Sequence, residues 1–332
     1  MARVFMAEAR VLAAWLHDLD PFVFQINGFG PRWYGVSYVL SALLGYWLFK
    51  GLAVRGYTDL KVERVADFIT WIGLFGVLLG GRLGWLVFYG FREKHAQGDW
   101  WWWLRVWEGG MASHGGILGI VVVTYILSRR WRVSWTSIGD SLCVVAPLGL
   151  FIVRCANFVN GELYGHETNA AWAVKFPQEI MAVQPVAEKV YAAVEPHRDL
   201  LAKYPNDRED YAEQVITAAR HEPRIAAAIE PVLTPRHPSQ LYEALLEGAL
   251  LFAMLWIART RFRTPRGVIT GLFFILYAVL RIIGEIFRVP DAAWHAGPFS
   301  AGQFLSLFMV GIGAAFLGWG VRARQYEQAD KS

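Results

Sequence analysis

Residues 267–287 read GVITGLFFILYAVLRIIGEIF, an apolar run in which Arg281 and Glu285 are the only charged side chains. As an α-helix this run is about 31 Å long, which is enough to cross the roughly 30 Å hydrocarbon core of a bilayer. Over the whole chain of 332 residues, 55% are hydrophobic and only 18% are charged. Soluble domains usually carry roughly a quarter of charged residues. The sequence therefore predicts a membrane protein.

Seven such apolar runs divide the chain, at 33–52, 66–89, 111–128, 137–157, 239–259, 267–287 and 301–321. Lys and Arg concentrate after the first, third, fifth and seventh runs, as in Arg129, Arg130 and Arg132. Short loops rich in Lys and Arg stay in the cytoplasm. We therefore predict an all-α polytopic membrane protein with seven transmembrane helices, an N-terminus outside and a cytoplasmic C-terminus.

The remaining segments give the chain a predicted order of five parts. Residues 1–32 form an N-terminal interfacial amphipathic segment, in which apolar residues at helical spacing predict a helix over 3–19. Transmembrane helices 1–4 and a signature loop occupy 33–165, and helices 5–7 occupy 236–322. Between them, the charged, proline-containing stretch 166–235 predicts short helices that form a small extracytoplasmic cap. Residues 323–332 are a predicted cytoplasmic tail.

A tryptophan cluster at 100–103, followed by Trp107, lies in the connection after the second run. Such clusters are typical of the aromatic belt at the boundary between lipid and water. We favour this anchoring role over a role in substrate binding.

Polar side chains inside a membrane are costly and usually functional. Here they gather at the predicted outer ends of the helices, with Asp140 as the exception at the cytoplasmic end. The residues in this group are Tyr34, Arg82, His114, Arg154, Asn157, Asn160, Glu162, His237, Ser239, Gln240, Glu243, Arg281, Glu285 and Arg288.

The run 267–287 shows the pattern within one helix. Tyr277, Arg281, Glu285 and the following Arg288 fall within an arc of about 80° at roughly 100° per residue. An Arg281–Glu285 pair that only makes two charges tolerable would also explain part of this stripe. Because several helices carry polar groups at the same depth, we favour a shared site.

Four arginines, Arg82, Arg154, Arg281 and Arg288, would then lie at the depth of lipid headgroups. Guanidinium groups present a fork of donors that suits phosphate oxygens. Apolar walls would suit acyl chains, so physics alone predicts a phospholipid ligand. Neither a Cys/His cluster nor an arginine-rich strip interleaved with aromatics occurs, so we expect no metal, no cofactor and no nucleic-acid partner.

His114 is the candidate general base, since it opens a helix beside two glycines and imidazole exchanges protons near neutral pH. A hydrogen-bonded packing role would also explain it. Glu162, Glu243 and Glu285 are alternative bases, and they could equally be counter-charges to the arginines. Because no G-x-S-x-G nucleophile motif is present, we expect the substrate to bring its own nucleophile.

Five blocks in order resemble prolipoprotein diacylglyceryl transferases. They are GGRLG at 80–84, GGMASHGG at 109–116, RCANFVNGELYG at 154–165, RHPSQLYE at 236–243 and RIIGEIFRVPD at 281–291. Three features depart from the family: Cys155 stands where a thiol is not usual, Ala156 stands where glycine is usual, and the 166–235 insert is longer than expected.

The resemblance implies a multi-pass enzyme of the bacterial plasma membrane, with its active site towards the extracytoplasmic face. It would move the diacylglyceryl group of phosphatidylglycerol to the lipobox cysteine of a prolipoprotein signal peptide. This first step of lipoprotein maturation forms a thioether and releases glycerol 1-phosphate. Arg154 and Arg281 would hold the phosphate, while His114 or a nearby carboxylate would help to deprotonate the thiol.

From the motifs and the polar residues together we expect two groups of site residues. The expected catalytic residues are Tyr34, His114, Arg154, Arg281 and Glu285. The expected substrate-binding residues are Arg82, Arg154, Asn157, Asn160, Glu162, Gly165, His237, Glu243, Tyr277 and Arg288.

Two other classes of membrane protein are weighed against this function. Transporters and channels often show internal repeats and a site near the bilayer midplane, whereas this chain shows no repeat and its polar groups lie at one end. A phospholipid hydrolase or phosphotransferase would need a metal cluster or an enzyme nucleophile, and the sequence offers neither clearly.

Overall fold

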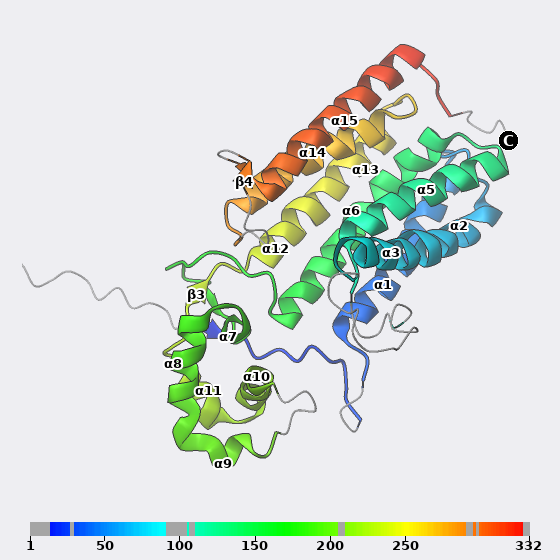
Figure 1. Cartoon of the computed structure of the whole chain (residues 1–332). Coiled ribbons are helices and arrows are strands. Elements are labelled where there is room, and N and C mark those ends of the chain that lie inside the picture. The colour runs from blue at the N-terminus through cyan, green and yellow to red at the C-terminus, as the bar shows by residue number, and fades with distance from the viewer. Residues whose placement is uncertain are drawn as a thin grey trace, which may run out of the picture. The chain divides into compact units, whose positions relative to one another are not determined.

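The computed structural model describes residues 14–26, 30–90, 105, 110–204, 210–289, 295–296 and 299–327, which are mostly helical (Figure 1). The chain divides into two compact units. The first unit comprises Met1–Tyr38, Leu150–Ala249 and Ala278–Leu307, and the second comprises Val39–Gly149, Leu250–Tyr277 and Phe308–Ser332.

All seven predicted apolar runs are helical. They correspond to α1 (Trp33–Val54); η1 (Val62–Arg64), α2 (Val65–Trp71), η2 (Ile72–Leu79), α3 (Gly80–Trp85) and η3 (Leu86–Gly90); α5 (Ser113–Trp131); α6 (Trp135–Asn160); α12 (Ser239–Glu243), η7 (Ala244–Leu250) and α13 (Leu251–Arg261); α14 (Val268–Glu285); and α15 (Ala301–Ala323). Within the described chain, six of these helices are long and apolar enough to cross a membrane, with mean hydropathies from 1.3 to 2.0. The protein is therefore a polytopic membrane protein. Helix α5 is not among the six, because polar residues occupy its first and last turns.

Close contact between α3 and α5 organises the second unit. A Cβ atom added at Gly115 would lie 2.3 Å from the carbonyl oxygen of Gly80 and 2.7 Å from the Cα of Gly84. Glycines at these positions let the two backbones touch, as small residues commonly do between membrane helices. Gly115, which follows His114 directly, therefore has a packing role.

Asp140 of α6, the one ionisable residue predicted at the cytoplasmic end, has a structural role in the second unit. Its buried carboxylate accepts hydrogen bonds from the backbone nitrogens of Gly267 and Thr270, at 2.7 and 2.8 Å, and from the Thr270 hydroxyl at 2.7 Å. The first turn of a helix has unpaired N–H groups and the positive end of the helix dipole. Asp140 thus caps the start of α14.

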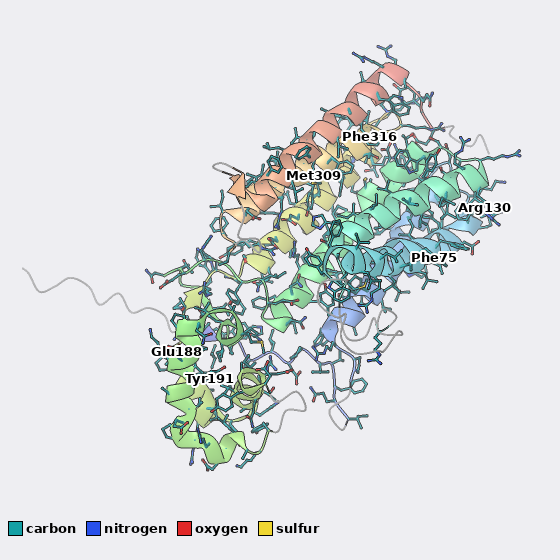
Figure 2. All side chains as sticks on the ribbon, viewed as in Figure 1. Phe75, Arg130, Glu188, Tyr191, Met309 and Phe316 are labelled. Atoms are coloured by element: carbon teal, nitrogen blue, oxygen red, sulfur yellow. The ribbon has the colours of Figure 1, made fainter. Side chains whose placement is uncertain are left out.

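The predicted short helices of the cap are present in the first unit. They are α7 (Glu179–Ala182), α8 (Gln184–Val194), η6 (Glu195–His197), α9 (Arg198–Leu201), α10 (Tyr211–His221) and α11 (Pro223–Ile229). Asp210 caps α10 by accepting from the backbone nitrogen of Ala212 at 2.9 Å. Their buried apolar side chains form one cluster, and Tyr191 of α8 (Figure 2) places its ring 4.9 Å from that of Tyr211.

Short strands correct the prediction of an all-α chain. In one sheet, β2 (Val174–Lys175) pairs in parallel with β1 (Trp15–Leu16) and antiparallel with β3 (Pro235–Arg236). A second pair joins β4 (His295–Ala296) and β5 (Phe299–Ser300). The helix predicted over 3–19 is therefore wrong at Trp15–Leu16, because pairing with a distant segment overrides local periodicity. Residues 1–13 and the tryptophan cluster lie outside the described residues.

His17 fastens this sheet to the end of α6. Its side chain is 1% exposed, and its Nε2 donates to the carbonyl oxygen of Phe158 at 2.7 Å. The rings of Phe158 and Phe176 lie 5.4 and 5.3 Å from the imidazole. Burial among these rings disfavours the charged form and lowers the pKa of His17 to about 4.

A histidine with a lowered pKa makes the folded state less stable as the solution is acidified. The unfolded chain takes up the proton near pH 6.5, whereas folded His17 resists protonation until the pH approaches about 4. We expect the folded state to lose roughly 3 kcal/mol from this group over that interval. Thermal unfolding of the detergent-solubilised protein at a series of pH values should therefore show a smaller pH dependence for His17→Leu than for wild type.

The matched control is His221→Leu, because His221 is exposed. This variant should keep the wild-type dependence on pH. Identical pH profiles for His17→Leu and wild type would show that His17 does not couple folding to protonation.

Candidate active site

A single buried carboxylate links two arginines from different helices of the first unit. Arg154 of α6 places its Nε 3.0 Å from Oε2 of Glu243, at the end of α12. Arg281 of α14 places its Nη1 2.6 Å from Oε1 of the same carboxylate. The structure therefore brings together the two arginines that the sequence analysis assigned to a phosphate.

A second carboxylate repeats this bridge and was missed by the sequence analysis. Glu247 lies in the π-helical stretch η7, and its Oε1 and Oε2 lie 3.2 Å from Arg281 Nη1 and 3.7 Å from Arg154 Nη2. Its position four residues after Glu243, in an otherwise apolar run, was the available signal. Stretches of π-helix often occur at functional sites.

Two further charges complete what we name the ionic cluster: Arg154, Glu243, Glu247, Arg281, Glu285 and Arg288. Arg281 Nη2 lies 2.9 Å from Glu285 Oε2, and Arg288 Nη1 lies 2.9 Å from Glu243 Oε1. The intrahelical Arg281–Glu285 pair thus exists, but Arg281 also contacts two carboxylates from another segment. An isolated Arg281–Glu285 ion pair, formed only to make two charges tolerable inside a helix, does not account for these further contacts.

Exposure differs between the two carboxylates that bridge Arg154 and Arg281 and these two arginines themselves. The side chains of Glu243 and Glu247 are 0% exposed, whereas those of Arg154 and Arg281 are 17% and 15% exposed. Buried charges are tolerated only when they are paired, which these carboxylates are. A ligand that approaches the cluster therefore meets guanidinium groups first, and anionic oxygens are their natural partners.

A chain of hydrogen bonds leads from the cluster to the signature loop, residues 160–165. Arg154 Nη1 donates to Asn157 Oδ1 at 3.5 Å, and Asn157 Nδ2 donates to Glu162 Oε1 at 2.7 Å. Asn160 Nδ2 lies 3.4 Å from the same oxygen. Asn157 therefore bridges Arg154 and Glu162, and Asn160 also binds the Glu162 carboxylate, so all four side chains belong to one polar network.

The backbone of the signature loop is strained and is held by α12. Leu163 has a φ of +59°, which is unfavourable for a residue with a side chain. The Ser239 hydroxyl donates to the carbonyl oxygen of Leu163 at 2.9 Å, and Gln240 Nε2 donates to that of Glu162. Ser239 and Gln240 are fully buried, so they fix the loop rather than contact solvent.

Gly165 ends the loop at a tight crossing of three segments. Its nitrogen donates to the carbonyl oxygen of His237 at 2.9 Å, and it forms an antiparallel bridge with Arg288. A Cβ atom here would lie 2.2 Å from the carbonyl oxygen of Phe287. The His237 ring packs 5.3 Å from that of Phe287, and its Nδ1 lies 3.1 Å from the Tyr242 hydroxyl.

Asn157 and His237 contact the signature loop, whereas four other expected site residues lie outside both the loop and the ionic cluster. In the first unit, Tyr34 accepts a hydrogen bond from the Tyr38 hydroxyl at 3.3 Å. The other three belong to the second unit, and the roles of all four stay predictions. There the buried Arg82 donates to the carbonyl oxygen of Gly110 at 3.1 Å, His114 is exposed in the first turn of α5, and Tyr277 stacks 5.8 Å from Phe273.

The family model described as prolipoprotein diacylglyceryl transferase matches residues 21–319. The chain belongs to this family. The prolipoprotein diacylglyceryl transferase match spans both the ionic cluster and the cap.

Curated relatives agree with the family model. A protein of Bdellovibrio bacteriovorus is 41% identical over 90% of this chain and 92% of its own length. A protein of Neisseria gonorrhoeae is 36% identical over 92% and 98% of the two chains, and one of Shigella boydii is 34% identical over 93% and 97%. All three are named phosphatidylglycerol–prolipoprotein diacylglyceryl transferase.

Gly165 gives a sharp test of this geometry in a prolipoprotein diacylglyceryl transferase. Gly165→Ala must push Phe287 and the neighbouring Arg288 away from the loop, so we expect activity to fall at least about tenfold and thermal stability to decrease. Gly311→Ala in α15 is the control, since nothing lies within 4 Å of its added Cβ. Equal activity and unfolding temperature in the two variants would contradict the crossing as described.

Proposed function

We propose that this protein transfers the diacylglyceryl group of phosphatidylglycerol to the thiol of the lipobox cysteine in prolipoprotein signal peptides. The products are a thioether-linked diacylglyceryl prolipoprotein and glycerol 1-phosphate, as in the first step of lipoprotein maturation. The observation that carries the proposal is the pair Arg154 and Arg281, held together by Glu243 and Glu247. Membership of the family and the names of the relatives support the choice of substrates.

The proposed reaction needs positive charge around the phosphate. The thiolate attacks the glyceryl carbon, the carbon–oxygen bond to the phosphate breaks, and the bonding electrons leave with that oxygen. The phosphodiester carries one negative charge, whereas the departing phosphomonoester gains a second. Guanidinium groups fixed in advance stabilise this extra charge more in the transition state than in the bound lipid. Arg154 and Arg281 have the exposure and the fixed positions for this role.

The thiol proton must pass to a base, because the thiolate is the reactive nucleophile. Glu243 contacts three guanidiniums, Glu247 contacts two and Glu285 contacts Arg281, which suits these carboxylates as counter-charges. Glu162 differs, because its side chain accepts from the amides of Asn157 and Asn160. We therefore keep His114 and Glu162 as the two candidate bases.

The other expected residues receive supporting roles in this proposal. Arg288 and Gly165 shape the loop that carries Glu162, and His237 packs against it. Asn157 and Asn160 orient Glu162 and, through Asn157, Arg154. Tyr34, Arg82 and Tyr277 stay candidates for contact with the substrate.

The proposed arrangement in the membrane has seven transmembrane helices, including α5. The N-terminus and the cap lie outside, the C-terminus lies in the cytoplasm, and the ionic cluster lies towards the extracytoplasmic face of the bacterial plasma membrane. The distribution of Lys and Arg among the short connections supports this orientation.

One assay tests the proposed reaction. Purified full-length protein in detergent is incubated with phosphatidylglycerol and a synthetic lipobox peptide, and the peptide is analysed by mass spectrometry. We expect a diacylglyceryl adduct on the cysteine and none on a peptide with serine in its place. Folded protein that yields no adduct would refute the proposed function.

The arginine pair makes a separate prediction in the same assay. Arg154→Ala and Arg281→Ala should each reduce turnover roughly 100-fold or more, because a preorganised charge at the leaving group is lost. Arg129→Ala, an exposed arginine of α5, should keep wild-type turnover and serves as the control. Turnover near the wild-type level in both cluster variants would refute the role of these arginines.

A further inference from the structure

A cleft of about 510 Å³ lies inside the first unit, beside the signature loop. Its walls come from three segments: the N-terminal stretch around Asp20 and Arg32, the loop residues Asn160 and Glu162, and the cap helices α7 and α10. This volume falls within the range of small binding sites in proteins.

An amide side chain in this cleft is buried without a partner. Neither Nε2 nor Oε1 of Gln178 has a hydrogen-bond partner among the described residues, and both atoms are buried. The amide covers Gly161, where an added Cβ would lie 2.3 Å from the Gln178 Cδ. Oδ1 of Asn160 and Nε of Arg220, also in the cleft, are buried and unpaired over the same described ranges.

These unpaired groups define the chemistry of a ligand. Leaving a buried donor or acceptor unpaired is costly, so a ligand that pairs with it gains affinity. A primary amide offers both a donor and an acceptor, which are the complements of the C=O and N–H of a peptide group. Gln178 can therefore pair with a polypeptide backbone at both of its atoms.

The charges of the cleft argue against an anionic ligand. Asp20, Glu162 and Glu213 contribute carboxylates, while Arg32 and Arg220 contribute guanidiniums. Asp20 and Glu213 are the acidic neighbours that act on Arg220. In the ionic cluster the two most exposed side chains are those of Arg154 and Arg281, whereas the cleft mixes both signs. A neutral polar chain fits the cleft better than a second phosphate does.

Glu162 connects the cleft to the ionic cluster. It lines the cleft and also accepts a hydrogen bond from Asn157, which in turn accepts one from Arg154. A chain lying in the cleft would therefore have one end beside the network that contains the proposed phosphate site. In the proposed reaction, the cysteine thiol of the protein substrate must reach this phosphate site.

We propose that this cleft binds, in extended form, the backbone of the acceptor protein just after its modified cysteine, with Gln178 as a specificity-determining contact. The proposal rests on the proposed function. The residues before the cysteine belong to the apolar part of a signal peptide, which suits lipid rather than a polar cleft. The residues after it lie outside the membrane, on the same side as the proposed position of the cap.

The test uses two lipobox peptides with the full-length protein and phosphatidylglycerol. The peptides are identical up to the cysteine, and one continues about eight residues beyond it whereas the other stops about two residues after it. Gln178→Leu should raise the KM of the long peptide roughly five- to tenfold, with kcat unchanged, because two hydrogen bonds are lost. The short peptide should show no change, and Gln184→Leu, at an exposed glutamine of α8, should affect neither.

A second variant changes the part of the cleft that α10 lines. Thr217 of α10 lines the cleft, so Thr217→Trp should fill it and again raise the KM of the long peptide alone. Ala227→Trp, at an exposed position of α11, is its control. The unchanged rate with the short peptide shows that each variant is folded.

The outcomes separate the two proposals. Equal KM values of both peptides with wild-type protein, or equal effects of the variants on both peptides, would overturn the role of the cleft. Failure of wild-type protein to modify either peptide would instead overturn the proposed function.

Discussion

The sharing of one buried carboxylate, Glu243, by guanidinium groups from separate helices is the interaction on which the site depends. Arg154 from α6, Arg281 from α14 and Arg288 beyond its end all contact it, and Glu247 repeats the bridge between the first two. Alone, each arginine inside an apolar helix would be expensive. Together they satisfy one another, and the carboxylates fix the positions of the guanidiniums before any ligand arrives. Such preorganisation is what a developing phosphate charge requires.

The rest of the first unit extends from this network. The end of α6 carries Asn157 and then the signature loop, whose strained Leu163 is held by the buried Ser239 of α12. The short sheet and His17 attach the N-terminal segment and the cap to the same helix end. Glu162 and Gln178 both line the cleft beside this loop, and the Gln178 amide packs against Gly161.

The helices could be predicted because apolar runs report directly on burial in lipid, and the gathering of Arg154, Arg281 and Glu285 followed from their equal depth. Glu247 was missed because it lies one turn deeper than the predicted polar layer. The strand at Trp15–Leu16 was missed because its partner, Val174–Lys175, is far away in the sequence. The sequence could not single out Gln178, because its proposed role depends on a contact with Gly161 that only the folded chain forms. His114 lies in the second unit, so its role as a base stays a prediction.

The most direct measurement is an experimental structure of the full chain with phosphatidylglycerol bound. The account predicts phosphate oxygens at about 3 Å from guanidinium nitrogens of both Arg154 and Arg281, with Glu243 still joining the two arginines. A lipid phosphate bound away from both guanidiniums, in protein that turns over the lipid, would contradict it.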